Sequence, residues 1–187
     1  VTTDAEGNQD YYNDDGSGSY VSDWGVSNWD GDGNSDYISS DGSYESHYNS
    51  DGTYYSINED GSSYFSTEDG VWGSTDAEGN TDLWHNDGLQ EHYNADGSGF
   101  SEHANGTTSS WDIEGNSSWE RADGVSGTVN ADGSGSTSYP DGSSQSWDAD
   151  GNVTFTDADG NTVESAQFTT GEFVNEDGAV VLFNSDG

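Results

Sequence analysis

The side chains of this chain that could do chemistry are nearly all carboxylates. Its 187 residues include 38 Asp and Glu, four His and a single basic residue, Arg121, for a formal net charge of −37. Most of the acids lie in a short unit that returns every nine residues and ends in Asp-Gly. Carboxylate oxygens suit hard divalent cations, and calcium accepts the irregular ligand shells that turns offer. The sequence therefore predicts calcium as its cofactor.

Local motifs point to the same cation. The pattern Asp-x-acid-Gly-Asn begins at Asp4, Asp76, Asp112, Asp148 and Asp157, and residues 30–36 have the D-x-D-x-N-x-D spacing of a linear calcium loop. In the alternative interpretation, Asp-Gly only forms turns and its carboxylates are solvated. The predicted metal ligands are Asp30, Asp32, Asn34, Asp36, Asp51, Asp60, Asp69, Asp76, Glu78, Asp87, Asp96, Asp112, Glu114, Asp123, Asp132, Asp141, Asp148, Asp150, Asp157 and Asp159.

Two periods organise the chain. Counting from Gly7 in steps of nine gives 21 positions, of which 18 are Gly. The bulky residues instead follow two rows with a spacing of 18 residues, one through Tyr11 and one through Val21. The structural repeat is therefore 18 residues, made of two unequal units of nine. These rows predict a core of Tyr11, Val21, Trp29, Ile57, Phe65, Leu83, Tyr93, Trp111, Trp119, Val129, Trp147, Phe155, Phe173 and Phe183.

This pattern predicts an all-β fold of the β-solenoid, β-roll-like class. Asp-Gly favours turns, and the stretches between turns are rich in Ser, Thr, Tyr, Val and Trp, which suit short strands. Two strands and two turns would make one coil of about 18 residues, and about ten coils would stack at roughly 4.8 Å each. Equivalent carboxylates would then lie at that spacing along each edge and repel, so the solenoid would need cations to neutralise them.

The paired nine-residue unit resembles the RTX β-roll family, whose repeat runs G-G-x-G-x-D-x-U-x. Its G-x-G step is present at Gly16/Gly18, Gly97/Gly99 and Gly133/Gly135. The family's Asp position is filled in these three places by Tyr20, Ser101 and Thr137. The resemblance implies a calcium-dependent β-roll, but it assigns no individual calcium ligand in this chain.

The composition excludes several function classes. The negative charge repels nucleic acid and anionic membranes, and no apolar run is long enough to insert into a membrane. The chain has no Cys and no Lys, and no pair of acids is marked out for catalysis, so we expect it not to be an enzyme. The scattered Thr residues do not predict an ice-binding face, and a zinc site or catalytic base among the His residues is disfavoured.

The ends of the chain suggest an assembly. The repeat runs from Gly7 to Gly187 without a distinct cap, and uncapped strand edges favour pairing between copies. We therefore expect a single repeat domain over 1–187, or one segment of a longer fibre, whose partner is itself in a head-to-tail homopolymer. The predicted assembly interface is its most apolar strand, Ala179, Val180, Val181, Leu182 and Phe183.

The first functional hypothesis is an extracellular or cell-surface structural protein, an acidic calcium-binding solenoid that builds a filament, surface layer or adhesin stalk. One alternative is a carbohydrate-binding adhesin module that binds glycans through exposed aromatic residues. A further alternative is the repeat region of an RTX-type secreted enzyme.

Overall fold

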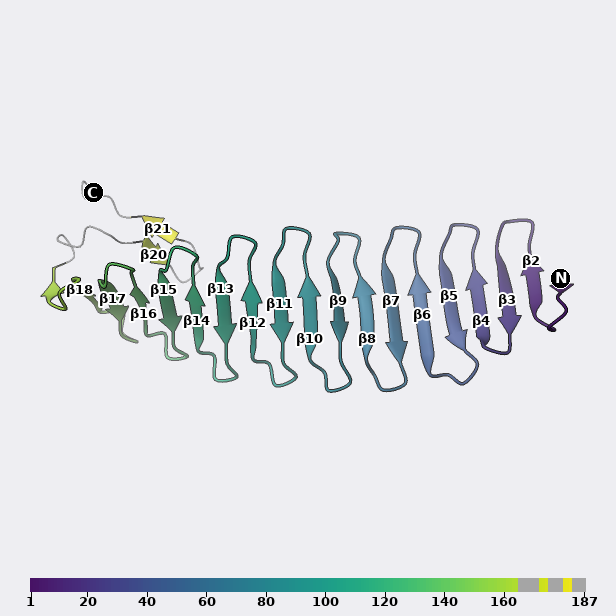
Figure 1. Ribbon diagram of the computed structural model, residues 1–187, viewed down its shortest axis with the longest axis horizontal. Helices are drawn as coiled ribbons and strands as arrows, with labels where there is room; N and C mark the ends of the chain where they lie inside the picture. Colours follow the sequence, from purple (N-terminus) through teal and green to yellow (C-terminus); the bar gives the residue numbers. More distant parts are fainter. Residues whose placement is uncertain (165–171, 175–179, 183–187) are drawn as a thin grey trace. The chain divides into compact units, whose positions relative to one another are not determined.

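The computed structural model describes residues 1–164, 172–174 and 180–182, and the elements in this part of the chain are β-strands joined by turns (Figure 1). The all-β prediction is confirmed. The chain divides into two compact units, Val1–Ala104 and Asn105–Gly187. Within the described residues, no helix has the length and hydropathy needed to cross a membrane.

Unit 1 (Val1–Ala104) contains twelve strands of two to five residues. They are β1 (Thr2–Thr3), β2 (Gln9–Tyr12), β3 (Gly18–Ser22), β4 (Gly25–Trp29), β5 (Ser35–Ser39), β6 (Tyr44–Tyr48), β7 (Tyr54–Asn58), β8 (Ser63–Ser66), β9 (Trp72–Thr75), β10 (Thr81–Trp84), β11 (Gln90–Tyr93) and β12 (Gly99–Glu102).

Unit 2 (Asn105–Gly187) continues the same strand-and-turn pattern. Its strands are β13 (Thr108–Trp111), β14 (Ser117–Glu120), β15 (Ser126–Val129), β16 (Gly135–Ser138), β17 (Ser144–Trp147), β18 (Val153–Thr156) and β19 (Thr162–Val163). A separate hairpin pairs β20 (Glu172–Val174) with β21 (Val180–Leu182).

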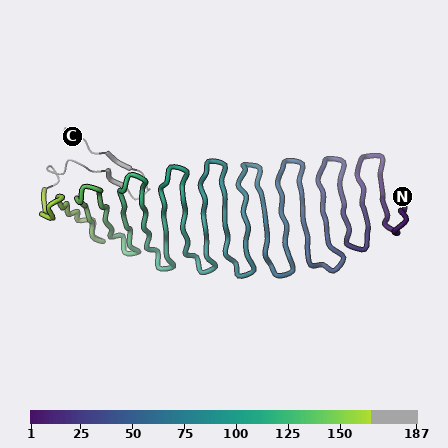
Figure 2. Tube along the Cα trace, in the orientation of Figure 1, coloured from purple at the N-terminus to yellow at the C-terminus, as the bar shows by residue number. Residues whose placement is uncertain are grey.

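Within β1–β12 of unit 1 and within β13–β19 of unit 2, each strand pairs antiparallel with its neighbours in sequence, so the chain runs back and forth across an open sheet in each unit (Figure 2). In β10, for example, Leu83 lies opposite Gly73 of β9 and Glu91 of β11. A solenoid would instead stack residues 18 apart in parallel. The predicted coil is therefore corrected to an antiparallel meander, because each Asp-Gly turn reverses the chain within one layer and does not lead it to a second strand layer.

The turn at residues 76–80 shows why the nine-residue unit reverses the chain. The Asp76 N–H donates to the Asn80 carbonyl at 2.8 Å, and the Gly79 N–H donates to the Asp76 carbonyl at 3.1 Å. Gly79 has φ of 92°, a left-handed conformation that glycine adopts without steric cost. This is the three-residue hairpin loop, a type I turn closed by a left-handed glycine. Asp-Gly at this spacing therefore specifies an antiparallel hairpin.

Neighbouring turns on one edge are joined through asparagine. Asn80 donates its side-chain N–H to Asp76 Oδ2 at 2.7 Å, and its Oδ1 accepts the Ala95 backbone N–H at 3.0 Å. The same link joins Asn34 to Ser50 and Asn116 to Ala131. These bonds explain the Asn that follows Gly in the motif, because one side chain closes its own turn and contacts the next turn on that edge.

Apart from Trp29 and Ser39, the register places both 18-residue rows on one face of the sheet in each unit, which we call the stripe face. Residues directly opposite each other share a face and successive residues alternate. In unit 1 the stripe face carries Tyr11, Val21, Val26, Ile38, His47, Tyr55, Ile57, Phe65, Leu83 and Tyr93. In unit 2 it carries Trp111, Trp119, Val129, Thr137, Gln145, Trp147, Phe155 and Val163. The rows therefore do not face each other across an interior.

A closed hydrophobic core is replaced by contacts within the layer. Among the described residues, Tyr139 is the one apolar side chain classed as buried, at 9% exposed. Large side chains instead lie over glycines of the adjacent strand. A Cβ on Gly135 would be 2.3 Å from Trp147 Cζ2, and one on Gly18 would be 2.4 Å from Trp29 Cζ2. Covering strand glycines with an aromatic ring from the next strand is a known way to stabilise a sheet.

Candidate functional site

The face of unit 1 opposite the stripe face is lined by aromatic rings, and we call it the aromatic face. The antiparallel register brings one or two rings from almost every strand to this side. Its members are Tyr12, Tyr20, Trp29, Tyr37, Tyr44, Tyr48, Tyr54, Tyr64, Trp72, Trp84, His92 and Phe100. Ser residues such as Ser46, Ser56 and Ser74 lie between the rings on the same face.

Four rings in the middle of the aromatic face form a continuous ladder from β7 to β10. The ring centroids of Tyr54 and Tyr64 are 5.9 Å apart, those of Tyr64 and Trp72 are 6.4 Å apart, and those of Trp72 and Trp84 are 4.3 Å apart. The two indoles are nearly parallel, with an interplanar angle of 12°. Tyr64 and Trp72 are each 40% exposed, so the ladder presents ring surface to solvent.

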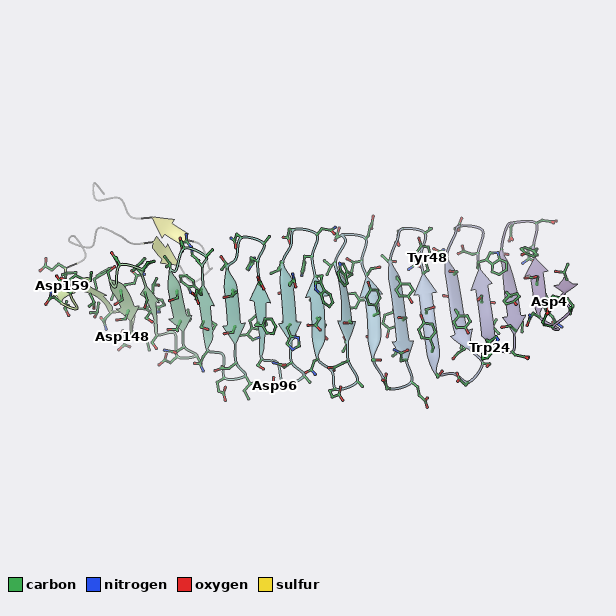
Figure 3. All side chains as sticks on the ribbon, in the orientation of Figure 1. Asp4, Trp24, Tyr48, Asp96, Asp148 and Asp159 are labelled. Atoms are coloured by element: carbon green, nitrogen blue, oxygen red, sulfur yellow. The ribbon has the colours of Figure 1, made fainter. Side chains whose placement is uncertain are left out.

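The ladder continues toward the N-terminal strands through paired rings. The hydroxyl groups of Tyr44 and Tyr54 are hydrogen-bonded at 2.7 Å. Tyr37 contacts Tyr44 with centroids 6.0 Å apart, and Tyr12 contacts Trp29 at 5.6 Å. Tyr48 of β6, labelled in Figure 3, is 47% exposed on the same face. The aromatic face is thus an extended surface of rings fixed by neighbouring strands.

Carboxylates stand beside the rings at the β10–β12 end of this face. Asp82 precedes Trp84 by two residues on the same face, and its Oδ1 lies 2.7 Å from His92 Nδ1. That hydrogen bond raises the pKa of the His92 imidazole above its ordinary value. Glu102 follows Phe100 by two residues on this face, and the Phe100 ring stacks on His92 with centroids 5.1 Å apart.

The stripe face of unit 1 carries its own ionic cluster. His47 Nδ1 lies 2.6 Å from Asp36 Oδ1, and His47 Nε2 lies 2.8 Å from Glu45 Oε1. These two hydrogen bonds, that to Asp36 foremost, raise the pKa of His47. Both imidazole nitrogens are therefore used within the sheet, which gives the cluster a cross-strand structural role.

Unit 2 has no counterpart of the aromatic face among its described strands. The side opposite its stripe face carries Glu120 and otherwise only hydroxyl side chains at the paired positions: Thr108, Ser110, Ser118, Ser126, Thr128, Ser136, Ser138, Ser144, Ser146, Thr154, Thr156 and Thr162. Some of them bond across strands, as Ser110 does to Ser118 at 2.8 Å. The two units therefore differ in surface chemistry although they share one repeat.

The predicted metal ligands lie mainly at the turns, as Asp96, Asp148 and Asp159 do in Figure 3. The first Asp of the motif accepts backbone N–H groups of its own turn; the set is Asp30, Asp76, Asp112, Asp148 and Asp157. A second set accepts the N–H two residues later: Asp51, Asp60, Asp87, Asp96, Asp123, Asp132 and Asp141. The other turn acids are Asp32, Asp69, Glu78, Glu114, Asp150 and Asp159.

The linear calcium loop is not assembled. Asp30 and Asn34 hydrogen-bond to each other at 2.5 Å, whereas Asp36 lies on β5 and pairs with His47. Over the described ranges no group of three or more His, Asp or Glu side chains is placed to hold a metal ion. The spacing argument for calcium is also wrong, because turns on one edge recur every second strand, at about 10 Å, and not every strand. Calcium as a cofactor stays a prediction.

The predicted core residues form a half-covered surface. The described members are half-buried or exposed: Tyr11, Val21, Trp29, Ile57, Phe65, Leu83, Tyr93, Trp111, Trp119, Val129, Trp147 and Phe155. All of these lie on the stripe face except Trp29, which the short turn between β3 and β4, where Ser22 pairs with Gly25, places on the aromatic face. Phe173 is in β20, and Phe183 is outside the described residues. Of the predicted assembly interface, Val180–Leu182 form β21, while Ala179 and Phe183 are outside that part.

The aromatic face is the feature that the sequence reasoning missed. The two 18-residue rows of bulky residues predict only the stripe positions and assign no face to the residues one position away. A signal was present, because Tyr54 and Trp72 are 18 apart, as are Tyr48, Ser66 and Trp84. Rows through the alternate strand positions would have predicted a second ring-bearing face.

Comparisons with known proteins give a likeness of fold. Neither models of protein families nor curated proteins match the chain. The wild-type TCP10 domain of Danio rerio CPAP has a TM-score of 0.59 and 19% identity, over 87% of this chain and 96% of that chain. The same domain in complex with a peptide of Danio rerio STIL has a TM-score of 0.53 and 18% identity, over 87% and 96%.

A third solved structure is the G-box domain of the microcephaly protein CPAP, described as suggesting a role in centriole elongation. It has a TM-score of 0.45 and 17% identity, over 80% of this chain and 98% of that chain.

These comparisons correct the predicted function and location. The three solved structures described above are TCP10 or G-box domains of CPAP, and none of these three is a secreted β-roll. The predictions of an extracellular calcium-binding filament, surface layer or adhesin stalk are therefore wrong, as are the adhesin and RTX-type alternatives and the cell-surface location. The physical reason for the error is that the nine-residue period was assigned to a calcium-bridged coil, whereas the turns close themselves with their own hydrogen bonds.

Proposed function

We propose that this chain is a non-catalytic protein-binding domain whose aromatic face in unit 1 holds an extended segment of a partner protein. The observation that carries the proposal is the solvent-exposed ring ladder of Tyr54, Tyr64, Trp72 and Trp84. The complex of the TCP10 domain of CPAP with a STIL peptide supports this class of partner, because that domain has a similar fold.

The chemistry of the ladder favours a proline-rich segment. Polyproline II segments dock on aromatic surfaces, since their rings pack on side-chain rings and their conformation is already ordered before binding. The aromatic face has the rings in place, held by cross-strand contacts, so the sheet needs no rearrangement to accept such a segment. A Ser hydroxyl beside the rings, that of the half-buried Ser74, is placed to hydrogen-bond a carbonyl group of the segment.

The test is binding of a fluorescent peptide made of Pro-Pro-Gln repeats, about twelve residues long, to the full chain by fluorescence anisotropy. Tyr64→Ala and Trp72→Ala should each weaken binding by about tenfold or more, because each removes a rung of the ladder. Tyr55→Ala is the matched control: Tyr55 is 42% exposed, close to the 40% of Tyr64, but it lies on the stripe face.

Equal loss of binding in all three variants would contradict the proposal, and so would no binding by the wild-type chain. A glycine-serine peptide that binds as well as the proline-rich one would also contradict it, because stacking on the rings would then contribute nothing. A glycan probe or a second copy of this chain that binds the ladder while the peptide does not would assign the face to another partner and overturn the proposal.

A further inference from the structure

We infer that the partner segment is basic, with Arg or Lys side chains that bind at Asp82 and Glu102 beside the ring ladder. This inference rests on the proposed function and adds the charge and spacing of the partner. The single Arg or Lys of the chain is Arg121, in unit 2, so unit 1 has no Arg or Lys of its own to pair with its acids.

Asp82 is placed to receive a cation from above the sheet. On the aromatic face it lies between Ser74 and His92 of the adjacent strands and two residues before Trp84. Its side chain is 47% exposed although Oδ1 bonds to His92. A guanidinium here would contact the carboxylate and stack on the exposed Trp72–Trp84 pair, and a cation over an indole face is attracted by the ring quadrupole.

Glu102 provides a second position of the same kind. It is exposed on the aromatic face two residues from Phe100, a ring that is 54% exposed. Asp82 is in line with His92 and Phe100, so Glu102 lies two strands over and two residues along from it, about 12 Å away. A polyproline II segment advances about 9 Å in each turn of three residues, and the length of Arg or Lys side chains covers the remaining distance, so basic residues three apart would meet these two acids in succession.

The net charge of the chain strengthens the same preference at longer range. A charge of −37 attracts a cationic segment and repels an acidic one. Long-range attraction alone would not depend on which acids are present. The preference for a basic segment therefore has a local part, which Asp82 and Glu102 contribute, in addition to the long-range attraction.

The experiment compares three fluorescent peptides of about twelve residues on the full chain: repeats of Pro-Pro-Arg, Pro-Pro-Gln and Pro-Pro-Glu. At low salt we expect the Arg peptide to bind at least about tenfold more tightly than the Gln peptide and the Glu peptide to bind most weakly. The double variant Asp82→Asn/Glu102→Gln should lose most of the Arg-over-Gln ratio and keep its affinity for the Gln peptide.

Glu68→Gln/Glu78→Gln is the matched control, since it removes the same charge from exposed turn positions of unit 1. This control variant should keep the wild-type ratio of affinities for the Arg and Gln peptides. Circular dichroism of both double variants checks that the sheet is intact. Equal loss of the ratio in the two variants, or equal binding of the Arg and Gln peptides by the wild-type chain, would overturn the inference while the proposed function stands. No binding of any proline-rich peptide would overturn the proposed function itself.

Discussion

At the scale of single residues, the turn aspartates are held ionised by hydrogen bonds. The hydroxyl and backbone N–H groups of Ser43, together with the Ser39 hydroxyl, donate to Asp41 and lower its pKa to about 2. The same kind of bond lowers the pKa of Asp76, where Asn80 is the main donor. Such bonds form in the folded turn and stabilise it only while the carboxylate is charged.

This gives a pH prediction for Asp41. Its folded pKa lies below the ordinary value near 4, so its stabilising contribution is fully present above about pH 4 and is lost as the pH falls toward 2. Asp41→Asn should unfold at a lower temperature than wild type at neutral pH, by about 2–4 °C, and the difference should shrink at acidic pH. Thermal midpoints by circular dichroism at the two pH values measure it.

Asp14→Asn is the control for this experiment. The Asp14 carboxylate is exposed, and within the described part of the chain no backbone or side-chain group donates a hydrogen bond to it. Both variants relieve the general charge repulsion, an effect that fades at acidic pH as carboxylates protonate, so only Asp41→Asn should unfold below wild type at neutral pH. A difference for Asp41→Asn that is the same at both pH values would contradict the role of the turn bonds.

At the scale of elements, the hairpin unit of nine residues decides which face a side chain occupies. Adjacent strands run in opposite directions, so residues nine apart, such as Thr81 on the stripe face and Gln90 on the aromatic face, lie on opposite sides. Residues 18 apart lie on the same side, as Leu83 and Phe65 do. Two strands, or 18 residues, are therefore the smallest segment whose deletion leaves the side chains of the following strands on their original faces.

A pair of deletions tests this rule. Without residues 63–80, Thr81 takes the place of Ser63, so Tyr54 should lie opposite Trp84 and their rings should touch. Without residues 63–71, Trp72 takes that place and should lie on the stripe face beside Ile57. Nuclear Overhauser contacts between Tyr54 and Trp84 in the first variant, and between Ile57 and Trp72 in the second, are the expected result. A Tyr54–Trp72 contact in the second variant would contradict the rule.

The elements also show what could be predicted from the sequence. The turn glycines, the short strands and the rows through Phe65 and Leu83 follow from local chemistry and periodicity, and the all-β class was correct. The pairing partner did not follow, since an 18-residue period fits both a parallel coil and an antiparallel meander. The site depended on that choice, because Trp72 and Trp84, 12 residues apart, stack only in the meander.

At the scale of the whole molecule, charge and the scarcity of buried apolar surface determine how stability responds to ions. A net charge of −37 opposes compaction, and salt screens that repulsion. Raising NaCl from about 10 mM to about 150 mM should raise the thermal midpoint by about 5 °C. CaCl2 at equal ionic strength should match NaCl if it acts by screening alone.

The measurement is a set of thermal unfolding curves in NaCl, CaCl2 and NaCl with a chelator, all at one ionic strength. Overlapping curves would show that calcium contributes nothing beyond screening. A calcium-specific rise in the midpoint that the chelator reverses would support calcium as a cofactor and contradict stabilisation by the turn hydrogen bonds alone.

The neighbour-only pairing of strands has a consequence for how each unit forms. Leu83 meets residues about ten positions away and none from a distant part of the sequence, so closing each new strand onto the last requires only a short loop. Contact order is therefore low for a β protein, and folding can start at any hairpin and spread strand by strand, as in repeat proteins. A sheet built this way opens by fraying from its outermost hairpins, so amide hydrogen exchange should report a gradient along the strands of a unit and not one global event.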